Sequence, residues 1–216
     1  MTTESTATVL GARQRRKQRT REALLHAALE LFTTQGYEET TVDEISEAVA
    51  VSQRTFFRHF SSKEAAAFAL MDLVESRFVT SLAERPPGES PLEAMRRAVL
   101  DSWDPLGEAI EAQVPVELHM RTYQLIQSTP SLLATHMRRS VDLEEVLARL
   151  IAEREGLDVD RDPRPRLVVA AFSGVMRMTG RLWGANDDMS PASLRELTAA
   201  YLDEFESALA HDWRSG

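Results

Sequence analysis

Two groups of side chains near the N-terminus have the chemistry to contact nucleic acid. Gln53 and Arg54 can each form two hydrogen bonds with the edge of one base, adenine for the amide and guanine for the guanidinium group. Residues 10–21 include six basic side chains and no acidic one, namely Arg13, Arg15, Arg16, Lys17, Arg19 and Arg21. Such a run can follow a phosphate backbone or enter the minor groove without reading sequence. Together the two groups predict a DNA-binding surface, provided that the fold brings them to one face.

The net charge of the whole chain is −9, which argues against a polyanionic partner until its distribution is considered. Residues 61–216 carry 17 basic and 26 acidic side chains, so the negative charge is concentrated there. We therefore expect residues before about 61 to bind DNA and residues 61–216 to have a different function.

Several other classes of site are not favoured. The sequence contains no cysteine, which excludes disulfides and thiolate metal sites. It has no nucleophile elbow, phosphate loop or metal-ligand spacing, so no catalytic residue, metal or cofactor is expected. The longest apolar run, residues 167–172, is far shorter than the roughly 20 residues that cross a bilayer. Without a secretory pattern at its start, the chain is expected to be a soluble cytoplasmic protein.

Apolar residues recur at intervals of three and four, while Pro and Gly are scarce and clustered, which predicts an all-α protein. Residues 1–12 are expected to form a disordered tail. The first helix is expected over residues 14–35, with Gly36 as a left-handed stop. The residues predicted on its buried face are Leu24, Ala28, Leu31 and Phe32.

Three helix-capping signals follow within 24 residues. Thr41 and Glu44 have the spacing of a capping box, which predicts a short helix from Thr41. Ser52 is a second N-cap, and it predicts a turn of about four residues before a helix that ends near residue 60. Ser61 with Glu64 predicts a long helix that ends near residue 84.

Two short helices joined by a tight turn are typical of a helix-turn-helix, here residues 41–60. Its second helix of eight or nine residues would span about 12 to 14 Å, which matches a major groove of about 12 Å. Its small core is predicted to contain Val42, Ile45, Val49, Val51, Phe56 and Phe60.

Residues 20–67 closely resemble the N-terminal signature of the TetR/AcrR family of transcriptional regulators. The matching positions are Gly36, Tyr37, Thr40, Thr41, Val42, Ile45, Val51, Ser52, Thr55, Phe56, Phe57, His59, Phe60, Ser62, Lys63 and Glu64. The resemblance implies a homodimeric regulator, usually a repressor, whose C-terminal helical domain binds a small ligand that releases DNA. It further implies a DNA-binding domain over residues 13–66 and an effector-binding and dimerisation domain over residues 67–216.

The resemblance also implies roles for single residues. Thr55, His59 and Lys63 match family positions that touch phosphate, and their side chains are suitable donors. The helices that start at Thr41 and Ser52 add backbone amides. The full set expected to bind DNA is Arg16, Arg19, Thr20, Thr41, Ser52, Gln53, Arg54, Thr55, Phe57, His59 and Lys63.

Three residues depart from the family pattern. Ala50 stands where the family usually has Gly in the turn, which costs about 1–2 kcal/mol if the residue is left-handed. Phe57 replaces a Tyr and lacks its phosphate-reaching hydroxyl. Arg54 replaces a frequent Gly and adds a base reader.

Beyond the Pro86–Gly88 break, helices are expected over residues 91–103, 108–128, 131–155, 164–184 and 191–210, with Pro105 and Pro115 as interruptions. Small residues in the fourth of these, and an apolar stripe in the fifth, predict a two-fold interface that would match a palindromic operator. The expected interface residues are Ala170, Gly174, Arg177, Leu194, Leu197, Tyr201 and Phe205.

Soft and aromatic side chains in the same region predict a largely apolar ligand pocket, for a hydrophobic or amphipathic effector. The expected lining residues are Met95, Val99, Trp103, His119, Tyr123, Met137, Phe172 and Met176, with Met120 and Arg177 as further candidates. Two alternatives stay open: a DNA-binding regulator controlled by a protein partner instead of a small ligand, and a helical enzyme using Glu117, His119 and Tyr123.

Overall fold

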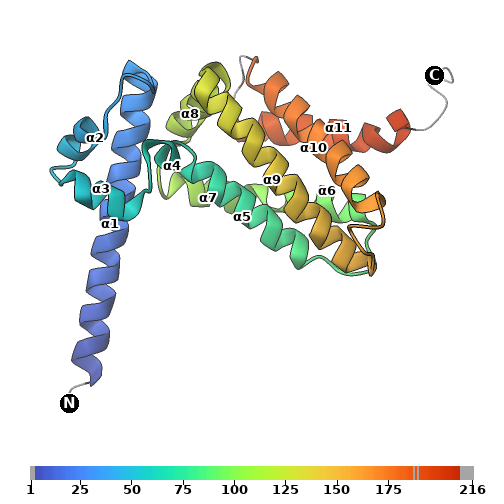
Figure 1. Cartoon of the computed structure of the whole chain (residues 1–216), viewed down its shortest axis with the longest axis horizontal. Helices are drawn as coiled ribbons and strands as arrows, with labels where there is room; N and C mark the ends of the chain where they lie inside the picture. Colours follow the sequence, from blue (N-terminus) through green and yellow to red (C-terminus); the bar gives the residue numbers. More distant parts are fainter. Residues whose placement is uncertain (1–2, 187, 189, 210–216) are drawn as a thin grey trace. The chain divides into compact units, whose positions relative to one another are not determined.

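A computed structural model describes the backbone of residues 3–186, 188 and 190–209, and the side chains of residues 13–103, 107–186, 188 and 190–205. All regular elements in this part of the chain are α-helices, which confirms the predicted all-α fold (Figure 1). They are α1 (Thr3–Gln35), α2 (Val42–Ala48), α3 (Gln53–His59), α4 (Lys63–Ala67), α5 (Ala69–Ala83), α6 (Pro91–Asp101), α7 (Trp103–Glu111), α8 (Val116–Ser128), α9 (Pro130–Glu155), α10 (Arg164–Trp183) and α11 (Pro191–Leu209).

The chain divides into two compact units that do not follow the chain order. The first contains Met1–Met71 together with Ala109–Leu132, and the second contains Asp72–Glu108 together with Leu133–Gly216. Helix α8 thus belongs to the first unit, although the sequence places it within the segment predicted to bind effector and dimerise. The functional division at residue 66 stays a prediction, since compactness alone does not assign a function.

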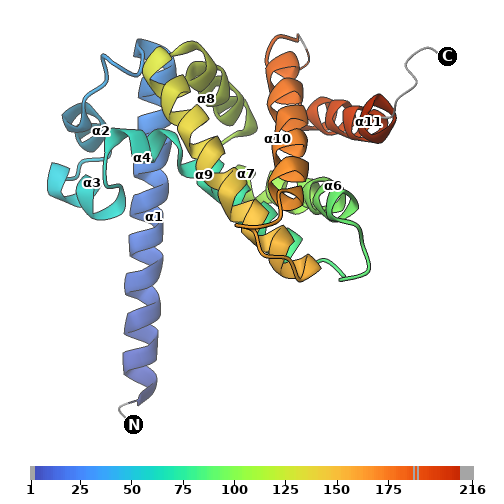
Figure 2. The same ribbon diagram turned by 45° about the vertical axis from the view of Figure 1, so that its right-hand side comes forward.

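In the first unit, α1 is the central helix. It contacts α2, α4 and α8, and α2 in turn contacts α3. Among the α1 side chains from Arg13 onward, five have no exposed surface: Leu24, Leu25, Ala28, Leu29 and Phe32. On α8 the residues buried in this unit are Leu118, Thr122 and Ile126, at successive intervals of four. Both views show the N-terminal part of α1 extending beyond the helices packed around its C-terminal half (Figures 1 and 2).

Helix α1 is longer than the sequence analysis predicts, because it begins at Thr3 instead of near residue 14. Residues 3–12, expected as a disordered tail, are therefore helical, and Met1 and Thr2 lie outside the described residues. The segment has no Pro, and extending an existing helix avoids the unfavourable step of nucleation. Gly36 ends the helix with φ 100°, the left-handed stop expected from the sequence.

The capping residues position the two short helices. Thr41 forms the complete capping box with Glu44, and the hydroxyl of Ser52 accepts a hydrogen bond from the amide of Thr55. Both predicted N-caps are confirmed. The third predicted N-cap, Ser61, was wrong by one residue, since the hydroxyl of Ser62 accepts the hydrogen bond from the amide of Ala65. The long helix expected to follow is also divided in two, because α4 ends at Ala67 with Phe68 as its C-cap, and α5 begins at Ala69.

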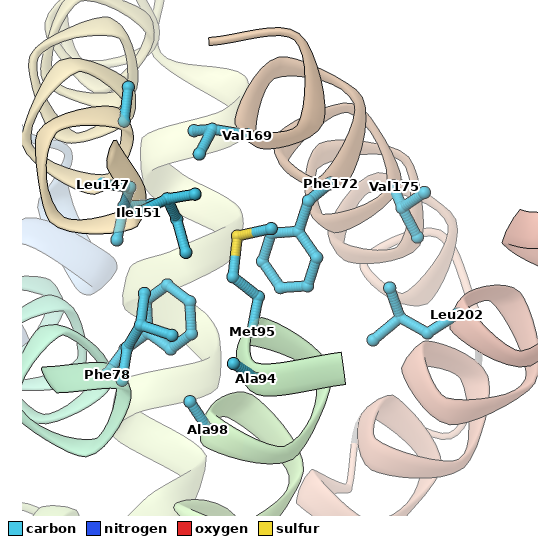
Figure 3. Packing of buried hydrophobic residues seen from close by; sticks show 12 residues of the cluster. Phe78, Ala94, Met95, Ala98, Leu147, Ile151, Val169, Phe172, Val175 and Leu202 are labelled. Atoms are coloured by element: carbon cyan, nitrogen blue, oxygen red, sulfur yellow. The ribbon is translucent and has the colours of Figure 1, made fainter. Parts of the chain in front are cut away.

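The core of the second unit is formed by α5, α6, α9, α10 and α11. In Figure 3 Phe78, Met95, Phe172 and Leu202 point from four of these helices toward a common centre, and α9 adds Leu147, Ile151 and neighbouring side chains. The rings of Phe78 and Phe172 are stacked, with centroids 5.9 Å apart and planes inclined by 10°. All four side chains are at least nine-tenths buried, and removing their apolar surface from water stabilises the unit.

The remaining helices follow the expected pattern, with one difference in where a proline acts. Pro115 precedes α8 and separates it from α7, which confirms the interruption predicted there within residues 108–128. Pro105 lies in the first turn of α7, where a missing amide donor is tolerated, so the interruption occurs before it, at Ser102. The last helix ends at Leu209, and the predicted end at Ala210 lies outside the described residues.

Ala50 adopts the left-handed conformation, with φ 54°. Its amide donates to the carbonyl of Glu47 (3.0 Å), and the amide of Val51 donates to the carbonyl of Ser46 (3.0 Å). This is the Schellman pattern, in which the left-handed position is normally a glycine. The strain expected for a left-handed Ala50 is therefore present. The turn keeps the geometry of a glycine turn although the Cβ atom of alanine clashes in this conformation.

We predict that Ala50→Gly stabilises the protein by about 0.5–1 kcal/mol, because relief of the left-handed clash exceeds the extra flexibility of glycine in the unfolded chain. Denaturant unfolding followed by circular dichroism measures the change. Ala48→Gly is the matched control: Ala48 is the last residue of α2, and the same substitution there is expected to destabilise by about 0.5–1 kcal/mol. Equal destabilisation by both variants would refute strain at Ala50.

Candidate DNA-binding surface

Helix α3 presents its first turn to solvent. Gln53 and Arg54 are exposed in this turn. Thr55 is half-buried, and the hydroxyl of Ser52 lies within hydrogen-bond distance of its hydroxyl (3.1 Å) and accepts from its amide (3.2 Å). One turn further on, Phe57 is 51% exposed, while Phe56 is fully buried. The helix therefore buries one aromatic ring in the unit and leaves the other, with the two candidate base readers, on its outer surface.

Gln53 is tied to the preceding helix. Its side-chain nitrogen donates a hydrogen bond to the carboxylate of Asp43, in the first turn of α2. Sequence reasoning did not select Asp43, and no local signal identifies it, because ten residues and a turn separate the two side chains. Only the packing of α2 against α3 brings them together.

The C-terminal end of α3 lies in a cationic environment. The pKa of His59 is lowered, first by partial burial and then by the positive charges of Arg58, Lys17 and Arg21. The guanidinium carbon of Arg21 lies 4.6 Å from the centre of the Phe60 ring, which links α1 to the end of α3. These groups create a positive potential at the junction of α1 and α3, where a phosphate would be attracted.

Lys17 and Arg21 belong to the basic run of α1 that was expected to follow a phosphate backbone, although neither is in the set of single residues expected to bind DNA. Arg58 is in neither group, and it follows Arg54 at a spacing of four on α3. That spacing places Arg58 on the same helix face as Arg54, which is a signal the sequence analysis could have used. The expected residues Arg16 and Arg19 are exposed on α1, and the hydroxyl of Thr20 donates to the carbonyl of Arg16 (3.0 Å).

The hydrogen-bonding groups of Thr41 are engaged in capping α2. Its amide and its hydroxyl both donate to one carboxylate oxygen of Glu44, at 2.8 and 2.9 Å. These hydrogen bonds, the backbone one first, lower the pKa of Glu44. The side chain of Thr41 is thus engaged in capping, and its contribution to phosphate binding stays a prediction.

Lys63 points into the protein and not toward solvent. Its ammonium group donates to three backbone carbonyls between α1 and α2, those of Tyr37 (2.7 Å), Thr40 (2.9 Å) and Glu38 (3.4 Å). It also lies 4.3 Å from the centre of the Tyr37 ring. All three protons of the ammonium group are therefore used, which favours a structural role over the phosphate contact expected from the family resemblance.

The residues expected at a dimer interface lie in different surroundings. Tyr201 and Phe205 pack partly against the core of the second unit, and Arg177 pairs with Glu144 on α9. Leu194 and Leu197 are half-buried on α11. Ala170 is exposed on α10, and a side chain added at Gly174 would meet no atom within 4 Å. The small-residue face of α10 is thus open in the described chain.

The structure brings together only some of the residues expected to line a pocket. Met95 and Phe172 are buried in the core of the second unit, and Val99 and Met176 pack against it. In contrast, Met137 is 45% exposed. Trp103, at the start of α7, has a buried indole nitrogen without a hydrogen-bond partner among the described residues. The buried residues of this set therefore form part of an apolar core, and the indole nitrogen of Trp103 is a buried polar atom without a hydrogen-bond partner among the described residues.

The other two expected lining residues, His119 and Tyr123, lie on α8 in the first unit. Burial lowers the pKa of His119 to about 4 and raises the pKa of Tyr123. Glu117, the third member of the acid-base cluster considered for an enzyme, is exposed two residues away from His119. The described residues contain no group of acidic or histidine side chains able to hold a metal ion, and no helix among them is long and apolar enough to span a membrane.

We predict that Lys63→Met destabilises the protein by about 2 kcal/mol, because the charged donor is lost and three carbonyls lose their partner. Chemical denaturation measures the difference. Lys17→Met removes the same charge from an exposed position of α1, and it is expected to change stability by less than about 0.5 kcal/mol. Unchanged stability of Lys63→Met, with weaker binding to every DNA sequence, would instead support a phosphate contact.

Comparison with known proteins identifies the family of this chain. Residues 24–70 match the family model described as bacterial regulatory proteins, tetR family, and residues 89–210 match the model of the MftR C-terminal domain. The HTH-type transcriptional regulator TcmR of Streptomyces glaucescens is 44% identical over 212 residues, which cover 98% of this chain and 94% of the relative. The predicted family resemblance is confirmed.

Solved structures share the fold. A SmeT–triclosan complex has a TM-score of 0.62 at 18% identity, covering 90% of this chain and 93% of the other. NalD, the secondary repressor of the MexAB-OprM multidrug efflux pump in Pseudomonas aeruginosa, has a TM-score of 0.55 at 20% identity, covering 91% and 98%. From the matched family models and the similarity to TcmR along nearly its whole length, the chain belongs to the TetR family and is a DNA-binding transcriptional regulator.

Proposed function

We propose that this regulator is a homodimeric repressor that reads a palindromic operator through α3 and is released by a small, largely hydrophobic ligand. The observation that carries the DNA-binding part is the outer surface of α3, where Gln53 and Arg54 are exposed in the first turn. The cationic groups around His59 lie at the other end of the same helix. Base readers at one end and phosphate-attracting charges at the other suit a helix that enters the major groove.

Within this surface, Arg54 reads a guanine and Phe57 lies against the groove without a hydroxyl for phosphate. A guanidinium group can donate two hydrogen bonds to guanine O6 and N7. An exposed aromatic ring can contact the methyl group of thymine. Arg58, Lys17 and Arg21 bind phosphates independently of sequence, and Arg16, Arg19 and Thr20 extend this contact along α1.

We predict that Arg54→Ala weakens operator binding by about 1–3 kcal/mol and relaxes the preference at one base pair. Selection from a random duplex library, followed by titration of single operator variants, gives both quantities. Arg58→Ala is the matched control, since it removes the same side chain from an exposed position one turn away; it should weaken all sequences alike. An equal loss on operator and random DNA for Arg54→Ala would exclude Arg54 as a base reader.

The dimer is proposed to form through α10 and α11. On α10, residues Leu167, Ala170 and Gly174 are spaced by three and four and so share a face. Leu167 is 65% exposed and Ala170 is exposed, which leaves an apolar face with room for close approach of another helix. A two-fold axis through this face would relate two copies of α3 by the same symmetry that relates the two halves of a palindrome.

Gly174→Leu is predicted to weaken the dimer at least tenfold, because the new side chain occupies the space that the second copy needs. The monomer should keep its fold, as nothing in the described chain lies within 4 Å of the added carbon. Gly107→Leu is the matched control, since Gly107 is also helical and equally open, on α7. Sedimentation equilibrium measures the dissociation constants. If Gly174→Leu dimerises like the unmodified protein, the interface lies elsewhere.

The ligand is proposed to bind in the second unit. The buried polar atoms there without a hydrogen-bond partner among the described residues include Trp103 Nε1, His136 Nδ1 and Thr198 Oγ1. Buried polar groups are normally paired, so such atoms are candidates for contact with a bound molecule. Met95, Val99, Phe172 and Met176 supply an apolar environment. A hydrophobic molecule with one or two polar groups fits this combination.

Triclosan, bound by the fold relative SmeT, is a suitable first probe, within a panel of hydrophobic aromatic compounds. A releasing ligand must bind the free protein more tightly than the operator complex, so it should raise the melting temperature and lower operator affinity together. A compound that stabilises the protein and leaves operator affinity unchanged would contradict release. If no compound stabilises the protein, the alternative of a regulator without a small-molecule effector is favoured.

A further inference from the structure

The contact between Asp43 and Gln53 joins the two helices of the DNA-binding surface. Asp43 is exposed in the first turn of α2, and Gln53 is exposed at the start of α3. The amide nitrogen of Gln53 donates to a carboxylate oxygen of Asp43. Asp43 is therefore a carboxylate on the face where the protein is expected to meet phosphates, which is an unfavourable place for a negative charge unless it has a specific task.

The carboxylate restricts the amide of Gln53 to one orientation. A carboxylate only accepts hydrogen bonds, so it pairs with the amide NH₂ and repels the amide oxygen. With one N–H held by Asp43, Gln53 keeps one N–H and one oxygen for a base. A glutamine without such a neighbour can rotate its amide by half a turn and exchange the positions of donor and acceptor.

One donor beside one acceptor is the complement of adenine in the major groove. Adenine presents the N7 acceptor and the N6 amino donor, whereas guanine presents two acceptors, N7 and O6. A fixed amide therefore gains two hydrogen bonds with adenine. Against guanine it places its oxygen opposite O6, and the two acceptors repel each other.

We propose that Asp43 is a specificity-determining residue, which positions the Gln53 amide so that α3 selects adenine over guanine at one base pair of each half-site. The inference rests on the proposed function, since it requires Gln53 to face a base. Asp43 itself acts through Gln53 and carries a charge that opposes DNA binding. The carboxylate of Asp43 thus increases base specificity and lowers the overall affinity for DNA.

The experiment compares Asp43→Asn with Gln53→Ala, using a random duplex library to define the preferred site and titrations of adenine and guanine variants at the affected base pair. Asparagine can donate to or accept from the Gln53 amide, so the amide is no longer fixed. The unmodified protein should prefer adenine by about 5- to 100-fold. Asp43→Asn should reduce this preference several-fold while it increases affinity for random DNA, because one negative charge is lost.

Glu47→Gln is the matched control, because it removes the same charge from an exposed position one turn further along α2. It should raise affinity for all sequences and leave the adenine preference unchanged. In the double variant Asp43→Asn/Gln53→Ala, the effect of Asp43→Asn on base preference should disappear. A variant that merely unfolds would lose affinity for random DNA as well, which distinguishes damage from lost positioning.

Two results would overturn the inference, and only the second would also contradict the proposed function. If Gln53→Ala removes the adenine preference but Asp43→Asn keeps it, Gln53 reads the base without help from Asp43. If Gln53→Ala leaves every base preference unchanged, Gln53 does not read a base, and that part of the proposed function fails together with the role of Asp43.

Discussion

The burial of α1 is the constraint on which the first unit depends. Its five fully buried residues, Leu24, Leu25, Ala28, Leu29 and Phe32, cover an arc of about 140° at 100° per residue. This arc is wider than the stripe of roughly 100° that an ordinary surface helix buries. The extra width allows α1 to contact α2 and α4 as well as α8. Helix α2 of the helix-turn-helix is therefore held against α1, and α3 packs against α2.

The sequence predicts the parts of this unit that local chemistry controls. Thr41, Ser52 and Gly36 act at helix ends, where the residue type itself satisfies a backbone group or adopts a rare conformation. Leu25 and Leu29 were not predicted as buried, because an apolar residue beside a recognised stripe does not show whether a second partner exists. Helix α1 also contacts α8, about 90 residues further along the chain, and no local pattern relates the two helices.

Among the residues of the candidate DNA-binding surface, local sequence again predicts some positions, and others depend on tertiary contacts. Gln53, Arg54 and Phe57 are exposed on α3 as the helical register predicts. Lys63 differs, because a family pattern records that a lysine occurs but not which way it points; here three carbonyls are within its reach. Asp43 was overlooked because a carboxylate is not an obvious DNA ligand. Tertiary structure therefore changes the role of charged residues more than that of apolar ones.

The left-handed turn at Ala50 has a consequence for motion. Its strain is relieved whenever the turn opens, so opening is easier than in a relative with glycine there, by a factor of about five for each kcal/mol of strain. The turn lies between the helix that carries Asp43 and the helix that carries Gln53. This strained turn connects α2 to α3, and its easier opening favours changes in the angle between the two helices, as docking into a groove of sequence-dependent width would require.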